Sequence, residues 1–95
     1  MILETALIHI KPGQEAEFLV ALESAKEVLA GAIGWKSISV KQGIERNSTF
    51  LLQIEWETLE NHTIDFREGP LFAQWRAIIG PFFDSAPDVE HWTFI

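Results

Sequence analysis

The stretch EWETLENHTIDFREGPLFAQWRAIIGPFF, residues 55–83, decides how this chain is organised. An apolar strand ends in this stretch at Trp56, and Thr58 is the predicted cap of a helix. A threonine hydroxyl at this position accepts a hydrogen bond from the free backbone amides of the first helical turn. A glycine-proline pair at 69–70 breaks the helix, and a second pair at 80–81 ends the helix that follows. The segment is rich in aromatic residues, and His62 is its one histidine. We therefore expect an aromatic-walled pocket with one titratable side chain.

The rest of the chain supplies a sheet behind this segment. Alternating and continuous apolar runs predict strands, and apolar residues three and four apart (Phe18, Leu22, Ala25, Leu29) predict one long amphipathic helix. Lysines at 36 and 41 are typical of an edge strand. The predicted order is strand 3–10, helix 14–30, strand 35–42, strand 49–56, short helix 59–67, helix 71–79 and strand 89–95.

This β-α-β-β-α-β order predicts an α+β fold of the ferredoxin-like kind, with a four-stranded antiparallel sheet and its helices on one face. The strands at 3–10 and 49–56 look apolar on both faces, yet the helices cover only one. An uncovered apolar face of a few hundred Å² is typical of an interaction site. We expect a homodimer through the open sheet face.

Composition excludes several classes of protein. The chain has 95 residues, enough for one domain over residues 1–95, and its net charge of −7 opposes nucleic-acid binding. It has no cysteine, which excludes disulfides and favours a reducing compartment. The N-terminal apolar run is interrupted at Glu4, too early for a signal peptide or a membrane span. We expect a cytoplasmic protein with no membrane contact.

The whole chain resembles the antibiotic biosynthesis monooxygenase (ABM) family of dimeric α+β barrels. The resemblance lies in the element order and length, in Trp56 at a strand end, in FREGPLFAQWRAIIGPFF at 66–83 and in VEHW at 89–92. It implies a ferredoxin-like dimer with a pocket between sheet and helices in each subunit. Members of the family include oxygenases of aromatic polyketides that use no metal or flavin, quinol oxygenases and haem-degrading enzymes.

The chain departs from the family at two places. Many members carry His-x-x-Ser-Pro-x-Phe where this chain has Phe66 to Phe72, so a phenylalanine stands at the histidine position. His62 lies four residues earlier, which puts it on the same helix face. The haem-degrading branch uses Asn, Trp and His where this chain has Ala6, Phe66 and Arg76, so we expect no haem degradation.

His62 is the candidate catalytic residue. A histidine at the mouth of an apolar pocket could take a proton near neutral pH, and the resulting phenolate or enolate would reduce O₂ directly. The alternative is a surface histidine bonded to Glu55 or to nothing. No histidine spacing indicates a metal site, and we expect neither a metal nor another cofactor.

The candidate substrate-binding residues surround this histidine. Phe66, Phe72 and Trp75 could stack against a planar ligand, although the break at 69–70 argues against grouping Phe66 with the other two, and core packing is the alternative. Arg76 could hold an anionic group, or pair with one of the many carboxylates. His91 faces either the pocket or the dimer interface. Its structural alternative is a hydrogen-bonded packing role, which we also expect for His9.

Two functions stay open. The first is a cofactor-independent monooxygenase acting on an aromatic or quinol-type small molecule, of which a small apolar or aromatic ligand would be the partner. The second is a non-catalytic module that binds a small ligand or simply dimerises. Isomerase or decarboxylase chemistry in the same pocket would need the same base.

Overall fold

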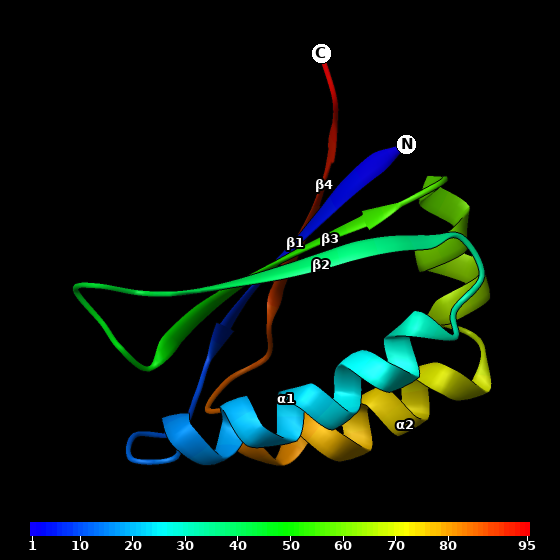
Figure 1. The fold of residues 1–95 in the computed structure, drawn as a ribbon. Coiled ribbons are helices and arrows are strands. Elements are labelled where there is room, and N and C mark those ends of the chain that lie inside the picture. The colour runs from blue at the N-terminus through cyan, green and yellow to red at the C-terminus, as the bar shows by residue number, and fades with distance from the viewer.

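The fold is a four-stranded antiparallel sheet with both long helices on one face (Figure 1), as the computed structural model of residues 1–95 shows. The strands lie in the order β2-β3-β1-β4, which is the ferredoxin-like arrangement, so the predicted fold class is confirmed. The elements are β1 (Ile2–His9), α1 (Glu15–Ala30), β2 (Trp35–Gln42), β3 (Thr49–Trp56), the π-helix η1 (Asn61–Phe66), α2 (Pro70–Ile79), the short 3₁₀-helix η2 (Gly80–Phe82) and β4 (Asp88–Thr93).

Strand β1 lies inside the sheet and pairs with β3 on one side and with β4 on the other. Successive side chains of a strand point to opposite faces, so every second residue of β1 points at the helices. These are Glu4, Ala6 and Ile8, followed by Ile10, and all four are buried. Three of them are apolar, and Glu4 is the exception.

Helix α1 covers the sheet with the stripe that its periodicity predicts. Phe18, Leu22, Ala25 and Leu29 are all buried, and the ring of Phe18 lies 5.0 Å from that of Phe50 on β3. Helix α2 packs beside α1 and closes the remaining part of the sheet. One layer of helices on one layer of sheet leaves the other sheet face open.

The turn after β3 determines where η1 begins. The Thr58 hydroxyl accepts a hydrogen bond from the backbone amide of Asn61 (3.2 Å), and the Asn61 side-chain oxygen accepts one from the Thr58 amide (3.0 Å). This reciprocal cap confirms the predicted helix start at Thr58. The Asn61 side chain packs directly against Gly34, whose φ of +78° favours glycine.

The open face of the sheet is less apolar than the sequence predicts. On β3 this face carries Thr49, Leu51, Gln53 and Glu55, so only one of the four side chains is apolar. The prediction that this strand is apolar on both faces was therefore wrong.

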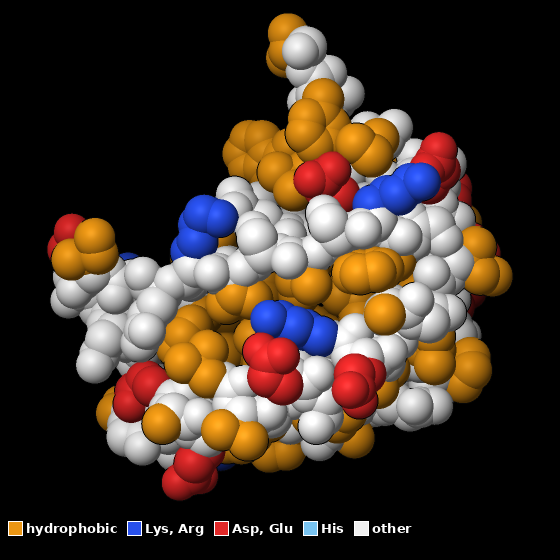
Figure 2. Space-filling model, in the orientation of Figure 1, with side chains coloured by type: hydrophobic (Ala, Val, Ile, Leu, Met, Phe, Trp, Pro, Cys, Tyr) orange, Lys and Arg blue, Asp and Glu red, His pale blue; other side chains and the backbone are white.

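Apolar groups on the open face concentrate toward β1 and β4 instead. They include Leu7 beside Leu51, and Leu3 beside Trp92. Figure 2 shows hydrophobic side chains gathered where the two chain ends leave the fold, and Trp92 and Phe94 are 50% and 54% exposed.

None of the helices combines the length and the apolar character that crossing a membrane would require.

Gly34→Ala is expected to lower the free energy of unfolding by about 2 kcal/mol. An added Cβ would overlap the Asn61 side chain, at a φ that alanine rarely adopts. Gly31→Ala is the matched control, because its Cβ would meet only ordinary contacts at 3.5 Å and beyond. Urea unfolding of both variants checks this. Equal stability of the two variants would contradict it.

Candidate functional site

A cavity of about 480 Å³ lies between the sheet and α2. Its walls come from β1, β3, η1, α2 and the segment that leads from α2 into β4, and 11 of its 17 lining residues are hydrophobic. This size and composition are typical of a small-molecule site. The polar groups that border it are few, and the charged ones are Glu4, Arg67 and Arg76.

Three aromatic side chains form one wall of the cavity. The ring of Phe66 lies 5.6 Å from that of Phe72 and 6.3 Å from that of Trp75, both in edge-to-face geometry. The expectation that the break at 69–70 separates Phe66 from the other two was wrong. Gly69 is extended and Pro70 starts α2 at once, so the chain turns back and brings α2 against η1.

Glu4 is the unexpected member of the site. Its side chain borders the cavity although the residue is only 5% exposed, and Trp56 donates a 2.9 Å hydrogen bond from Nε1 to Glu4 Oε1. Burial raises the pKa of the Glu4 carboxyl to about 7, more than the Trp56 hydrogen bond and the Arg67 charge lower it. This group therefore changes charge near neutral pH.

The sequence did not predict a site role for Glu4, which served there only as evidence against a signal peptide. A signal was present: Glu4 shares a strand face with Ala6, Ile8 and Ile10, which all look like core residues. A lone carboxyl on the apolar face of a central strand has to be buried, and buried carboxyls are candidates for proton transfer.

His62 lies behind the cavity wall rather than at its mouth. It is 3% exposed and its ring stacks on Trp56 at 5.3 Å, so the alternative of a surface histidine bonded to Glu55 was wrong. Its Nε2 lies 3.3 Å from Glu4 Oε1. Burial first, then the nearby charges of His91 and Arg67, lower the pKa of His62 to about 4. At neutral pH the imidazole is uncharged.

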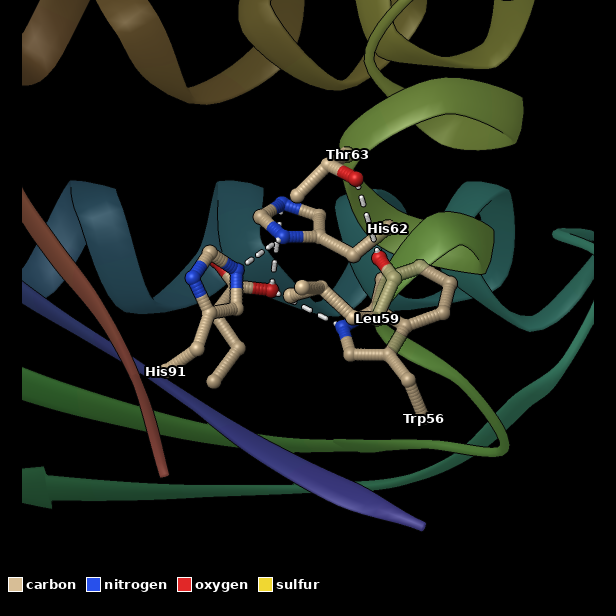
Figure 3. Close-up of polar contacts among 6 residues, drawn as sticks. Trp56, Leu59, His62, Thr63 and His91 are labelled. Atoms are coloured by element: carbon tan, nitrogen blue, oxygen red, sulfur yellow. Dashed lines mark hydrogen bonds and ion pairs between the residues drawn. The ribbon is translucent and has the colours of Figure 1, made fainter. Parts of the chain in front are cut away.

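His91 faces the helix side of the sheet, opposite Glu4 on the neighbouring strand. Its Nε2 lies 2.7 Å from His62 Nδ1, and Figure 3 shows the two rings pointing toward one another beside Trp56. Burial, with the Arg67 charge, lowers the pKa of His91. Glu4, His62 and His91 thus form a continuous row of polar contacts from the cavity to the exposed His91 on β4.

His62 can donate toward Glu4 and accept from His91 at the same time. An ionised carboxylate only accepts hydrogen bonds, so the proton on His62 belongs on Nε2 when Glu4 is charged. Nδ1 then accepts from His91 Nε2–H. The three side chains contact through different nitrogens of His62, and no group of three His, Cys, Asp or Glu side chains could hold a metal ion.

The mouth of the cavity carries two arginines. Arg76 does not belong to any of the three ion pairs of the structure, so the expectation that it pairs with a carboxylate was wrong. Arg67, which the sequence reading did not single out, is likewise outside them. Their guanidinium carbons lie 5.2 Å (Arg67) and 6.0 Å (Arg76) from the centre of the Phe72 ring.

Of the remaining predicted residues, Phe66, Phe72, Trp75 and Arg76 all border the cavity, and their role toward a substrate stays a prediction. His9 lies on the open face, where Nδ1 is 3.3 Å from the Thr49 hydroxyl. This contact with the neighbouring strand is its only side-chain polar contact, which agrees with the packing role expected of it.

Comparison with known proteins gives consistent matches over the chain. The family model of the antibiotic biosynthesis monooxygenases matches residues 1–78. The Bacillus subtilis (strain 168) protein YczJ, described as uncharacterised, is 38% identical over 91 residues, which cover 96% of each chain.

Solved structures agree with this match. A Bordetella bronchiseptica protein described as a candidate antibiotic biosynthesis monooxygenase superposes with a TM-score of 0.96 at 33% identity, covering 99% of this chain and 96% of that one. A conserved protein from Methanosarcina mazei Go1 shares the fold, with a TM-score of 0.81 at 18% identity over 99% of this chain and 92% of that one.

Glu4 and His62 should give opposite pH dependences of stability. The pKa of Glu4 rises on folding from 4.5 to about 7, so the stability present at low pH is lost as pH rises through that range. The pKa of His62 falls from 6.5 to about 4, so stability is lost as pH falls through that range.

Glu4→Gln isolates the first effect. As pH rises from 5 to 8, we expect the free energy of unfolding of this variant to increase by about 2–3 kcal/mol relative to that of wild type. One pKa unit corresponds to about 1.4 kcal/mol. Urea unfolding at fixed protein concentration measures the difference. The exposed Glu17→Gln should show no such trend, and stability curves of Glu4→Gln and wild type that stay parallel would refute the argument.

Proposed function

The chain belongs to the antibiotic biosynthesis monooxygenase family, and from that premise we propose that residues 1–95 form one domain whose cavity oxygenates an aromatic or quinol-type small molecule without a cofactor. The observation that supports the proposal most is the buried Glu4 carboxyl, which borders an aromatic-walled cavity and has a pKa of about 7. A general base works best when its pKa lies near the working pH.

In the proposed reaction, ionised Glu4 accepts a proton from an acidic C–H or O–H of the substrate. The electron-rich anion passes one electron to O₂, and the two radicals combine to form a C–O bond. The peroxide then takes back the proton held by Glu4 and loses water, so that a CH₂ group and O₂ give a C=O group and H₂O. The protein orients the anion and keeps water away from it.

His62 is better suited to position Glu4 than to act as the base. A pKa of about 4 leaves it uncharged at neutral pH and makes it a weak proton acceptor. The contact of 3.3 Å between Nε2 and Glu4 Oε1 instead favours a role in which His62 orients Glu4 as a donor. His91 supports the same arrangement from the other side of the imidazole.

The substrate ring would lie against Phe66, Phe72 and Trp75, with Arg76 at the mouth. Aromatic pairs gain about 0.5–1.5 kcal/mol beyond the area they bury, which suits a wall built for a planar ligand. The cavity volume of about 480 Å³ has room for two or three fused rings. Binding without turnover would make the protein a ligand-binding module instead.

We further propose that two copies pack through their open sheet faces. Leu3, Leu7, Leu51 and Trp92 supply the apolar groups, and Trp92 donates a 2.8 Å hydrogen bond from Nε1 to the Thr5 hydroxyl. The apolar chain end, with Phe94 and Ile95 exposed, extends this surface. Burial of such a face is the usual route to a stable pair.

Oxygen uptake without added metal or flavin tests the chemistry, with anthrone and hydroquinone as substrates. We expect kcat/KM to rise with pH through about 7, as Glu4 ionises, and Glu4→Gln to lower it by about 100-fold or more. His62→Gln should move the inflection of the pH profile, which a purely structural role would leave in place. Glu17→Gln should match wild type. Uptake that persists in Glu4→Gln would exclude Glu4 as the base.

Sedimentation equilibrium tests the dimer. Wild type should have about twice the chain mass of 10.8 kDa, and Leu51→Lys should shift it toward a monomer, because a buried charge without a partner is costly. Val20→Lys is the matched control, since Val20 is exposed on α1 away from the open face. Wild type that sediments as a monomer would rule the dimer out.

A further inference from the structure

We infer that the ligand of this cavity is an aromatic acid whose anionic group is held at the mouth by Arg67 and Arg76. This inference rests on the proposed function, because it names the substrate class of the same site.

The cavity is a cationic spot on an acidic protein. The chain has 14 acidic and 7 basic residues, yet the lining of the cavity contains two arginines and one carboxyl, that of Glu4. With a pKa of about 7, Glu4 is ionised in only part of the molecules at neutral pH. The lining therefore carries one or two positive charges in either state, which attracts an anion that the rest of the surface repels.

The two arginines also lie where one ligand could reach both. Arg67 follows directly after η1 and Arg76 belongs to the last turn of α2, so they come from separate elements. Both guanidinium groups nevertheless lie within 6.0 Å of the Phe72 ring centre. Both are exposed and neither belongs to an ion pair, so their donors are free for a ligand.

The chemistry of the guanidinium group selects the kind of anion. Its planar set of N–H donors matches a carboxylate through two parallel hydrogen bonds, which a single point charge cannot do. Because one wall is aromatic, the carboxylate should sit on a flat ring system that lies against Phe66, Phe72 and Trp75. Glu4 lies deeper, so the acidic hydroxyl or C–H belongs at the opposite end of the ligand.

Two matched probes test this reading. 6-Hydroxy-2-naphthoate carries a hydroxyl and a carboxylate at opposite ends of one planar ring system, and 2-naphthol lacks only the carboxylate. Their dissociation constants are measured by isothermal titration calorimetry at 20 mM and 500 mM NaCl. The proteins are wild type, Arg67→Gln, Arg76→Gln, the double variant and the control Arg46→Gln, which changes an arginine in the β2–β3 loop outside the cavity lining.

We expect wild type and Arg46→Gln to bind 6-hydroxy-2-naphthoate at least 10-fold more tightly than 2-naphthol at low salt. The double variant should lose this preference without weakening 2-naphthol, and high salt should reduce the preference because exposed charges are screened. Circular dichroism establishes that each variant is folded.

Equal affinity of the two probes, a preference that survives in the double variant, or no binding of either probe would overturn the inference. The measurement is binding alone, so it separates the two proposals. A lasting preference for the acid without any oxygen uptake would count against the oxygenase only. Oxygen uptake with no preference for the acid would count against the arginine site only.

Discussion

The position of Glu4 on a strand with neighbours on both edges is the constraint around which this site is built. Because β1 pairs with β3 and β4, its side chains have only two directions, and Glu4 points toward the helices. A carboxyl cannot leave that layer for water without breaking the ladder. The groups around it therefore have to satisfy it: Trp56 donates a hydrogen bond to the carboxyl, and His62 Nε2 lies 3.3 Å from it.

This arrangement works against stability. A buried carboxyl with one firm hydrogen bond keeps its charge poorly, which is why its pKa lies near 7, and a methionine or leucine there would serve the core better. His62 is buried in the same way with the opposite result, since burial lowers the pKa of a base. Two titratable groups in contact at a cavity, one with its pKa raised and the other with its pKa lowered, are typical of a site where protons move.

The segment at 55–83 supplies both the central residue of the Glu4–His62–His91 row and the aromatic wall of the cavity. The cap at Thr58 starts η1, whose wide turn closes with a hydrogen bond from the Arg67 amide to the His62 carbonyl (3.0 Å). Single π-turns of this kind are often found at functional sites. The glycine-proline break then reverses the chain and sets Phe72 of α2 against Phe66. One short stretch thus supplies the histidine that contacts Glu4, the aromatic wall and both mouth arginines.

The sequence by itself determined the elements and their order. Apolar periodicity, the cap at Thr58 and the glycine-proline pairs are local signals, and the observed bounds differ from the expected ones by only one or two residues at most ends. Of the candidate residues, Phe66, Phe72, Trp75 and Arg76 border the cavity, and the sequence could single them out because they share one aromatic segment.

Only the tertiary structure decided which titratable groups meet. Glu4, His62 and His91 lie on β1, η1 and β4, far apart in the chain, and come together through strand register and the turn after β3. Their pKa values depend on burial, which no local pattern reports. Periodicity is a property of neighbours in sequence, whereas a site is a property of neighbours in space. For this reason the sequence predicts the helices and strands, and only the structure shows the contacts among Glu4, His62 and His91.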